Sequence, residues 1–312
     1  MNYRKYGNSG KMVSEIGFGA WQLGNKEEWN GPDEEQAINL VHEAVRLGCN
    51  FFDTAPNYGR GKSEVLLGKA LNSYPREKLV INTKVGHVPG ETNGFDYDVI
   101  IKTVENSLKK LQTDYLDSVI LHNPPIEMLN QKSPQFKALE RLKSEGLIKE
   151  YGASLDYSKE VELLLERTES NVVEILFNIF FQDVRKTFEK LEEKGMAVIV
   201  KVPLDSGWLT GKYNKDSKFE GIRSRWSKDV IERRAQLVEK IKKIKDSNIP
   251  MTIEALSFIL SYDAISTIAV GVKNIEQLKE NIKASDYKIS LEKVKLYEKL
   301  YEQEIADNPL PW

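Results

Sequence analysis

Cysteine and histidine, the residues that build disulfides and most metal sites, are scarce in this chain. Its 312 residues include one cysteine, Cys49, and three histidines. A single cysteine excludes an internal disulfide and a thiolate metal cluster, and three scattered histidines argue against a histidine-rich metal site. Cys49 comes just before an apolar segment, where a small buried hydrophobic residue is the expected role. We therefore expect no metal centre.

Long apolar runs and an excess of one charge are missing as well. No apolar run approaches the roughly 20 residues that a membrane span requires, and Met1–Tyr6 contains no apolar signal core. The formal net charge is −2, with acids and bases mixed throughout, so no basic surface for nucleic acid or anionic lipid is indicated. We expect a cytoplasmic protein that binds neither nucleic acid nor membranes. The hydrophobic fraction of 40% is typical of a globular protein with a large core.

Short apolar segments alternate with amphipathic ones along most of the chain. Residues 3–12 predict a hairpin with its turn at Asn8–Gly10. Strands are predicted at 14–18, 50–53, 79–83, 116–121, 148–153, 172–177, 197–202 and 266–270. Helices are predicted at 33–47, 63–71, 97–111, 135–145, 159–166, 184–194, 229–247, 275–283 and 291–305.

Eight strand–helix units in one regular alternation require a parallel sheet covered by helices. Their number and length favour a closed barrel over an open sheet. No linker or low-complexity segment divides the chain. We therefore expect an α/β protein with a single domain over residues 1–312, a (β/α)8 TIM barrel with an N-terminal hairpin and an extra C-terminal helix.

Two glycine motifs look like nucleotide-binding loops but have the wrong spacing. Gly17 and Gly19 follow a strand, yet the third glycine of a dinucleotide fingerprint is replaced by Gln22. Gly61–Ser63 resembles the end of a phosphate loop, but Pro56 stands where the first glycine is required. The sequence therefore predicts neither a dinucleotide fingerprint nor an ATP phosphate loop.

Polar side chains follow three neighbouring predicted strands at the points where the strands end. Asp53 closes the second strand and Tyr58 lies in its loop, Lys84 follows the third strand, and His122 follows the fourth. The carboxyl ends of parallel strands share one rim of a barrel, where active sites lie. Each residue alone also fits a structural role, as a loop cap, a surface lysine or a core histidine. Because three adjacent strands end in this way, we favour a functional site.

The residue types indicate the chemistry. Asp53 provides a counter-charge for a partly buried Lys84. A tyrosine hydroxyl ionises near pH 10 in water, and a nearby ammonium lowers that pKa. His122 suits a hydrogen-bond donor to a substrate oxygen. Such a site holds a carbonyl oxygen and gives it a proton. Since no nucleophile–base pair and no metal-ligand set accompany it, we infer that the electrons come from a bound hydride donor.

At these residues the sequence resembles the aldo-keto reductase family, and the likeness covers essentially the whole chain. Thr83–Lys84 and Leu121–His122 fall where the family has its lysine and histidine. The family's second-strand signature is similar to Asp53–Gly59, Gly61, Ser63–Glu64 and Leu67–Gly68. The resemblance implies a catalytic tetrad of Asp53, Tyr58, Lys84 and His122, with Tyr58 as general acid, and NADPH bound extended across the barrel mouth.

The resemblance also implies which residues contact the cofactor and the substrate. Residues 203–212 would hold the pyrophosphate, with Lys212 adding charge, and residues 271–281 the adenosine end. Lys273 suits a 2′-phosphate, which favours NADP over NAD, and Arg223 or Arg225 would clamp the cofactor. The cofactor set is Gly19, Ala20, Trp21, Asp53, Ser154, Glu174, Lys201, Pro203, Leu204, Ser206, Gly207, Leu209, Gly211, Lys212, Arg225, Gly271, Lys273, Gln277 and Asn281. The substrate set is Trp21, Tyr58, His122 and Asn123, with Trp29, Trp208, Trp226 and Trp312 as further candidates.

Three residues depart from the family around the expected nicotinamide. Leu155 replaces an asparagine, Glu174 a glutamine, and Lys201 an aromatic ring that many members have. Glutamate oxygens still accept a hydrogen bond from the carboxamide nitrogen. The added carboxylate favours oxidised, cationic nicotinamide, and an adjacent lysine opposes it. We therefore predict cofactor binding that is weaker or differently poised.

Three functions remain open at this stage. The first is an NADPH-dependent reductase of an aldehyde, a ketone or a small sugar-like carbonyl. The second is a regulatory protein of the same fold that senses redox state by holding NADPH with little turnover. The third is a barrel enzyme of another class that uses Lys84 as a Schiff base. The sequence leaves open the substrate, NADP against NAD, the direction of reaction and the oligomeric state.

Overall fold

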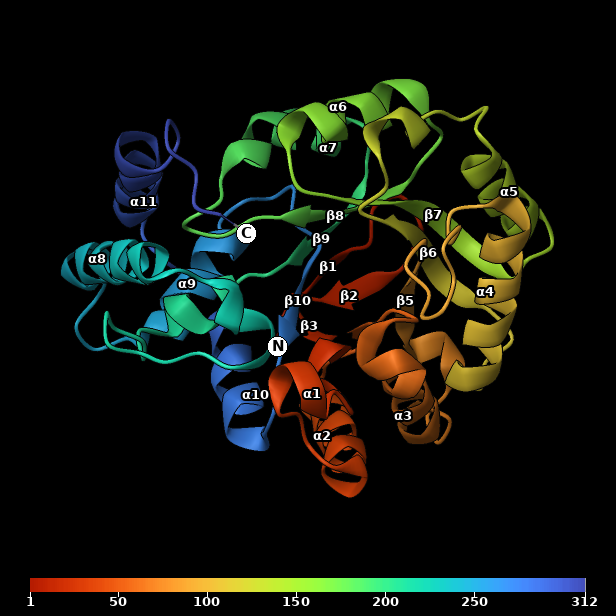
Figure 1. The fold of residues 1–312 in the computed structure, drawn as a ribbon, viewed down its shortest axis with the longest axis horizontal. Helices are drawn as coiled ribbons and strands as arrows, with labels where there is room; N and C mark the ends of the chain where they lie inside the picture. Colours follow the sequence, from red (N-terminus) through yellow and green to blue (C-terminus); the bar gives the residue numbers. More distant parts are fainter. Residues whose placement is uncertain (312) are drawn as a thin grey trace.

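The computed structural model describes residues 1–311, and its centre is a closed barrel of parallel strands ringed by helices (Figure 1). The strands pair in the order β10-β3-β4-β5-β6-β7-β8-β9, so the last strand closes on the first. Their bounds are β3 (Ile16–Gly19), β4 (Phe51–Asp53), β5 (Val80–Val85), β6 (Leu116–His122), β7 (Ile148–Leu155), β8 (Val172–Leu176), β9 (Ala197–Lys201) and β10 (Thr267–Gly271). The predicted barrel is confirmed. Trp312, a candidate wall of the pocket, lies outside the described residues.

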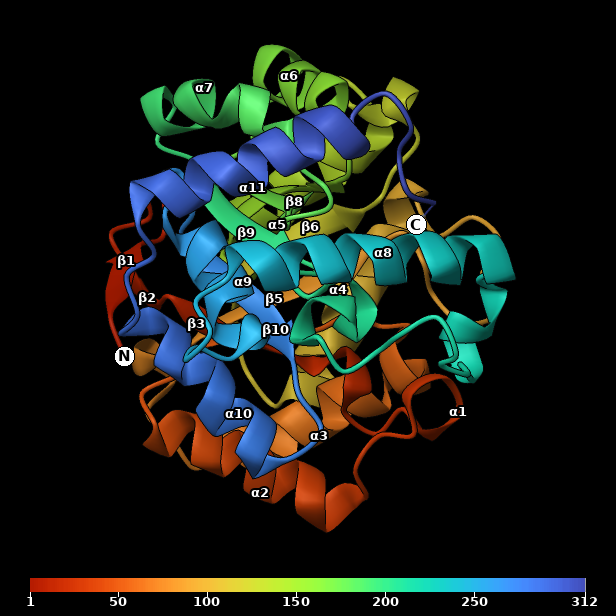
Figure 2. The same ribbon diagram turned by 90° about the vertical axis from the view of Figure 1, so that its left-hand side faces the viewer.

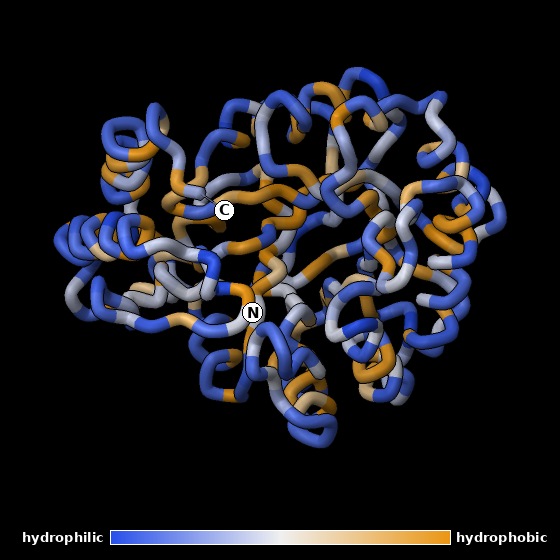
Figure 3. The backbone as a smooth tube through the Cα atoms, in the orientation of Figure 1, coloured by the Kyte–Doolittle hydropathy of each residue, from blue (hydrophilic) through white to orange (hydrophobic). Residues whose placement is uncertain are grey.

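Helices surround the barrel, and most of them lie between successive strands in the chain. They are α1 (Lys26–Trp29), α2 (Glu34–Arg46), α3 (Lys62–Leu71), α4 (Tyr97–Leu111), α5 (Pro134–Ser144), α6 (Ser158–Arg167), α7 (Phe188–Glu193), α8 (Lys228–Ile244), α9 (Met251–Leu260), α10 (Ile275–Ile282) and α11 (Leu291–Glu304). α2 begins where Asp33 and Gln36 form a capping box, which satisfies two otherwise unpaired backbone N–H groups. Figure 3 shows the hydrophobic segments concentrated in the central strands and hydrophilic segments around the outside.

Helix α9 is absent from the sequence-based assignment. All ten of its residues, Met251–Leu260, are buried. Because a helix buried on every side shows no polar face, it lacks the periodicity by which amphipathic helices are recognised. α9 is the last helix before β10, so α8, which the sequence did predict, is an addition to the regular alternation. Figures 1 and 2 show α8 and α11 next to each other on one side of the barrel.

The N-terminal hairpin closes the floor of the barrel. Its strands β1 (Tyr3–Lys5) and β2 (Met12–Ser14) pair antiparallel. Tyr6 follows β1 and is buried, and its hydroxyl lies 2.6 Å from Ser118 Oγ on β6. Ser118 in turn donates to Asn82 Oδ1 at 2.6 Å. With Phe51, Ile120 and other apolar side chains, this layer fills the lower barrel and leaves the opposite, carboxyl-terminal mouth for a site.

Candidate active site

The structure brings together the four residues that sequence reasoning placed at neighbouring strand ends. Asp53 ends β4, Lys84 lies in β5 one residue before its end, and His122 ends β6. Lys84 Nζ lies 2.5 Å from Asp53 Oδ1 and 5.3 Å from the centre of the Tyr58 ring. The rings of Tyr58 and His122 are 6.0 Å apart. Parallel pairing of β4, β5 and β6 produces this convergence, because it brings their carboxyl ends to one rim.

Lys84 also contacts a second carboxylate that lies across the barrel. Glu174 Oε1, on β8, is 3.2 Å from Lys84 Nζ, and Lys84, Asp53 and Glu174 are all buried. The other carboxylate oxygen, Glu174 Oε2, is buried without a hydrogen-bond partner among the described residues. Asn82 donates to Asp53 Oδ1 at 2.7 Å from below and fixes the orientation of that carboxylate. A single ammonium thus lies between two carboxylates.

Burial and these charges set the ionisation of the site. Burial raises the pKa of Asp53 to about 6, with Lys84 lowering it and Glu174 raising it further. Burial alone would lower the pKa of Lys84, but the carboxylates of Asp53 and Glu174 outweigh that effect and raise it, so Lys84 remains an ammonium. Burial lowers the pKa of His122 well below its usual value, with Lys84 and Lys201 acting in the same direction, so its imidazole is neutral at neutral pH.

Lys84 lowers the pKa of Tyr58, as expected, but the net shift of this pKa is upward. The ammonium does lower this pKa, but burial raises it more, and Asp53 and Glu174 add to the rise. The physical reason is that a phenolate loses more by leaving water than it gains from an ammonium whose charge two carboxylates already offset. Tyr58 therefore stays protonated at neutral pH.

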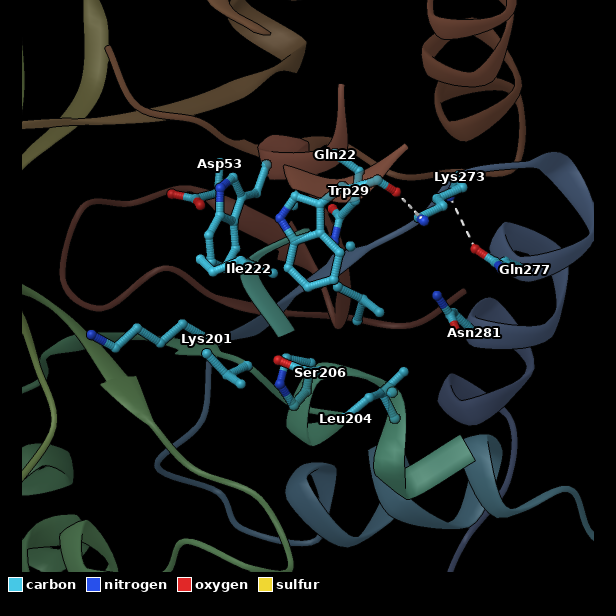
Figure 4. A pocket seen from close by; sticks show the side chains of 18 of the residues that line it. Gln22, Trp29, Asp53, Lys201, Leu204, Ser206, Ile222, Lys273, Gln277 and Asn281 are labelled. Carbon is cyan, nitrogen blue, oxygen red and sulfur yellow. Dashed lines mark hydrogen bonds between the residues drawn. The ribbon is translucent and has the colours of Figure 1, made fainter. Parts of the chain in front are cut away.

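Asp53, Tyr58, His122 and Glu174 line one end of an elongated cavity of about 820 Å³, and Lys84, which contacts two of them, is not in its lining. Figure 4 shows Asp53 and Lys201 at one end and Lys273, Gln277 and Asn281 at the other. A smaller cavity of about 450 Å³ adjoins it, shares Asn57 and is lined mainly by residues 86–96. The long shape suits an extended ligand with its reactive part beside Tyr58.

A model of the Aldo/keto reductase family matches residues 15–302. The chain belongs to the aldo/keto reductase family. The uncharacterized oxidoreductase YqkF of Bacillus subtilis (strain 168) is 29% identical to it over 317 residues, covering 98% of each chain. L-galactose dehydrogenase of Arabidopsis thaliana is 32% identical, covering 90% of this chain and 87% of the relative. The solved holo form of aldo-keto reductase AKR11C1 from Bacillus halodurans superimposes with a TM-score of 0.82 at 27% identity, with 100% of both chains covered.

As an aldo/keto reductase the chain is an oxidoreductase, and the family's chemistry is carbonyl reduction with a nicotinamide cofactor. The tetrad residues that the resemblance implied are the ones that converge at the cavity end. Among residues 1–311, no helix is long and apolar enough to cross a membrane, and no group of metal-ligating side chains is found.

Most residues assigned to the cofactor of this reductase line the large cavity. Those that do are Gly19, Trp21, Asp53, Glu174, Lys201, Pro203, Leu204, Ser206, Gly207, Lys212, Gly271, Lys273, Gln277 and Asn281, together with Tyr58, His122 and Asn123 from the substrate set. Five assigned residues are not in the lining: Ala20, Ser154, Leu209, Gly211 and Arg225. Ala20 and Leu209 are fully buried in the core, and Ser154 lies behind Lys201, whose ammonium donates to its Oγ at 2.8 Å.

Lys201, one of the three residues that depart from the family pattern, belongs to a connected polar network. Lys201 Nζ donates to Asn123 Oδ1 at 2.7 Å and pairs with Asp156 Oδ1 at 2.7 Å. Because Ser154 Oγ accepts from the same ammonium, its hydroxyl hydrogen is free to point away from Lys201. The ion pair with Asp156 therefore offsets part of the charge that Lys201 brings to the cavity.

The segment after β9 has a strained backbone. Val202, Asp205 and Ser206 have φ of 54°, 44° and 53°, a region that side chains disfavour. A buried ion pair from Arg234 to Asp205, 2.9 Å long, holds the segment in place. Strain of this kind persists only where surrounding structure enforces it, and here it shapes a cavity wall that includes Ser206.

Sequence reasoning left Arg223 and Arg225 as alternatives and missed Tyr213, a further wall residue of the cavity. Arg223 lines the cavity while Arg225 does not; Arg223 lies 5.5 Å from the centre of the Trp29 ring and donates to the Tyr213 hydroxyl. Lys273 donates to the carbonyl of Trp29. The segment between β9 and α8 has no regular sequence pattern by which to place these two arginines. Only the folded loop therefore shows which of them lines the cavity.

Three cations, Lys212, Arg223 and Lys273, line this part of the cavity, and none forms an ion pair with a carboxylate in the described part of the chain. Burial lowers the pKa of Lys273, and the charges of Arg223 and Lys212 lower it further. Uncompensated cations that repel one another are a site for a multiply charged anion. These residues fit the phosphates of a nicotinamide dinucleotide.

His87 is a second residue that the sequence did not single out. Its ring lies 5.2 Å from the ring of His122 and 5.5 Å from that of Phe95. His87 follows Lys84 by three residues, and this closeness in sequence could have indicated that it lies near the site. On the other side, Trp21 stacks on Tyr58 at 5.7 Å. Aromatic rings therefore surround the Tyr58 and His122 end of the cavity.

Proposed function

We propose that this chain reduces an aldehyde or ketone to the alcohol with NADPH, and that Tyr58 is the general acid. The observation that carries the proposal is the arrangement of Tyr58, Lys84, Asp53 and His122 at one end of a long cavity whose other end holds unpaired cations. When bound, the nicotinamide supplies a hydride to the carbonyl carbon.

Each of the chain's own residues has a definite part in this proposal. His122, held neutral by burial, donates an N–H to the carbonyl oxygen and adds no charge of its own. Tyr58 keeps its proton until the oxygen becomes an alkoxide, a base strong enough to take it. Lys84 then stabilises the phenolate that remains. Asp53, fixed by Asn82, keeps the ammonium in place.

NADP rather than NAD is supported by the charges at the far end of the cavity. The three positive charges of Lys212, Arg223 and Lys273 exceed the two negative charges of one pyrophosphate. A 2′-phosphate adds close to two further negative charges. Arginine binds phosphate by two parallel hydrogen bonds, and lysine acts as a point charge. For the substrate, Trp21, Tyr58, His122 and Asn123 line the same end and favour an apolar or ring-shaped carbonyl compound.

The decisive experiment follows NADPH absorbance with an activated aromatic aldehyde. Removing the general acid in Tyr58→Phe is expected to lower kcat about 10²- to 10⁴-fold, the usual contribution of general acid catalysis, with NADPH affinity unchanged. Tyr157→Phe, at an exposed tyrosine, is the matched control and is expected to leave turnover as in the wild type. Undiminished turnover by Tyr58→Phe would refute the assignment.

A second candidate is a redox sensor that binds NADPH with little turnover. The departures at Leu155, Glu174 and Lys201 favour it, because they alter the surroundings of the nicotinamide. Micromolar NADPH binding by the wild type, without turnover of any carbonyl tested, would establish it. A Schiff base at Lys84 is disfavoured, because its two carboxylate neighbours keep it protonated and a protonated amine is not a nucleophile.

A further inference from the structure

Arg234 lies where three segments that are distant in the sequence meet. Its side chain projects from α8 and is fully buried. Nε donates to Asp205 Oδ2 at 2.9 Å, and Nη2 donates to the backbone carbonyl of Pro311 at 2.8 Å. The guanidinium carbon lies 5.1 Å from the centre of the Trp226 ring. One buried cation therefore joins the segment after β9, the loop before α8 and the C-terminal segment, residues 305–311.

Two of these segments form walls of the large cavity. Leu204 and Ser206, on either side of Asp205, line it, and so does Arg223 in the loop that ends at Trp226. Asp205 and Ser206 have φ of 44° and 53°, so the wall is strained and keeps its shape only while its contacts enforce it. Among residues 1–311, the carboxylate of Asp205 has no hydrogen-bond partner other than Arg234. The shape of this wall thus depends on where the guanidinium lies.

The C-terminal segment is docked on α8 (Figure 2). Leu310 is 3% exposed and belongs to the hydrophobic core. Arg233, next to Arg234 on α8, donates to the backbone carbonyl of Asn308. A buried leucine and backbone carbonyls that accept from two neighbouring arginines therefore hold the segment in place.

Docking of the segment determines the orientation of the Arg234 guanidinium. The group is planar and its donors point in fixed directions, so the bond from Nη2 to Pro311 also aims Nε at Asp205. If the segment leaves, Nη2 loses its acceptor and water reaches the ion pair. Because an ion pair in water is weaker than a buried one, Asp205 and the strained Ser206 beside it are then held less firmly.

We propose that Arg234 is a positioning residue that couples docking of the C-terminal segment to the cavity wall at residues 204–207, so that the docked segment strengthens NADPH binding. The inference rests on the proposed function, which makes this cavity the cofactor site. The coupling acts on the wall and not on Tyr58 or His122, so it changes the affinity for NADPH and leaves the chemical step as it is. By thermodynamic reciprocity, bound NADPH stabilises the docked segment by the same factor.

The first experiment undocks the segment in the full-length chain. Leu310→Asp places a charge where an apolar side chain is buried, and Leu291→Asp is the matched control because Leu291 is 76% exposed. Fluorescence titration is expected to give a Kd for NADPH about tenfold higher in Leu310→Asp, within the usual range of couplings between sites, and an unchanged Kd in Leu291→Asp. At saturating NADPH, kcat is expected to stay within about twofold of the wild type in both variants.

The variant Arg234→Lys tests whether the coupling passes through this residue. Lysine keeps a cation for Asp205 but cannot donate in two fixed directions. Arg234→Lys is expected to raise the Kd for NADPH by a similar factor, and adding Leu310→Asp is expected to change it little further, because both substitutions break one connection. A purely structural role would lower the free energy of unfolding without changing the Kd. Additive effects in the double variant, or a wild-type Kd in folded Arg234→Lys, would overturn the role of Arg234.

A second arm uses the unmodified protein, so it does not depend on how a variant folds. The N–H of Asn308 donates to the carbonyl of Ile305 at 3.0 Å, and its hydrogen exchange reports on the segment. Saturating NADPH is expected to slow this exchange about tenfold and to leave the N–H of Ser9, in the N-terminal hairpin, unaffected. Equal exchange at Asn308 with and without NADPH, or a wild-type Kd in folded Leu310→Asp, would overturn the inference and leave the proposed function intact. Absence of binding of every nicotinamide dinucleotide by the wild type would overturn both.

Discussion

The ionisation of Asp53 gives a stability measurement that tests the electrostatic description of the site. Burial raises its pKa from 3.8 to about 6 in the folded chain. A carboxyl group whose pKa is raised by folding binds a proton more readily when folded, so folded stability increases as the pH falls through 6 toward 3.8. The direction is opposite to that of an ordinary salt-bridged aspartate, whose contribution is lost on acidification.

The magnitude follows from the two pKa values. A difference of about two units, at 1.36 kcal/mol per unit, amounts to about 3 kcal/mol when titration is complete. Between pH 7.5 and pH 5, where only part of the titration occurs, the linkage relation gives a gain of about 1.4 kcal/mol. Asp53→Asn removes the ionisation and keeps the polar side chain, so the wild type is expected to gain about 1.4 kcal/mol relative to this variant over that interval.

Equilibrium urea unfolding at the two pH values measures this difference, with tryptophan fluorescence as the signal. Other groups titrate in both proteins, so the comparison isolates Asp53. Glu174→Gln supplies an internal check: because Glu174 raises the pKa of Asp53, its removal is expected to shrink the effect. Parallel pH dependence of wild type and Asp53→Asn would refute the reasoning, and so would a larger effect in Glu174→Gln.

Two further changes separate structural from binding roles. Lys84→Met leaves Asp53 and Glu174 facing each other without a cation. The free energy of unfolding is expected to fall by about 3–5 kcal/mol. Urea unfolding unchanged from the wild type would contradict the buried triad of Asp53, Lys84 and Glu174. Arg223→Ala is expected to weaken NADPH binding about tenfold, as measured by fluorescence titration, because it removes roughly one charge-assisted contact. Arg225→Ala, at a residue outside the cavity lining, is expected to change the NADPH affinity less than threefold. Equal effects of the two substitutions would contradict the assignment of Arg223.

The sequence predicted the barrel and the four converging residues because both depend on local patterns. Alternating strands and helices have short-range periodicities, and a closed parallel barrel brings all strand ends to one rim. Residues immediately after an apolar strand, such as Asp53 and His122, can therefore be placed from their position alone. Lys84 needed only a small correction, since β5 runs to Val85 and the lysine lies within the strand.

Three features depended on the whole fold and were missed. The contact of Lys84 with Glu174 joins β5 to β8, strands that are not neighbours and meet only through the barrel interior. The net pKa of Tyr58 depends on how much water the folded walls exclude, which residue types do not reveal. α9 is buried on every side and gives no periodic signal. The pattern of residues along the chain does not reveal contacts between distant strands, the loss of water around a side chain, or a helix that is buried on all sides.

The buried floor of the barrel bears on how Tyr58, as the proposed general acid, would recover its proton. From Tyr6 the hydrogen bonds run through Ser118 and Asn82 to Asp53, so a continuous chain connects the bottom of the barrel to the site. Asn82 interrupts that chain as a proton wire, because its oxygen accepts from one side while its separate amide nitrogen donates on the other. Burial also raises the pKa of Tyr6, which makes it a poor proton source. In the proposed reaction, Tyr58 is therefore expected to regain its proton through the mouth by which product leaves, so the two events would share one opening in every cycle.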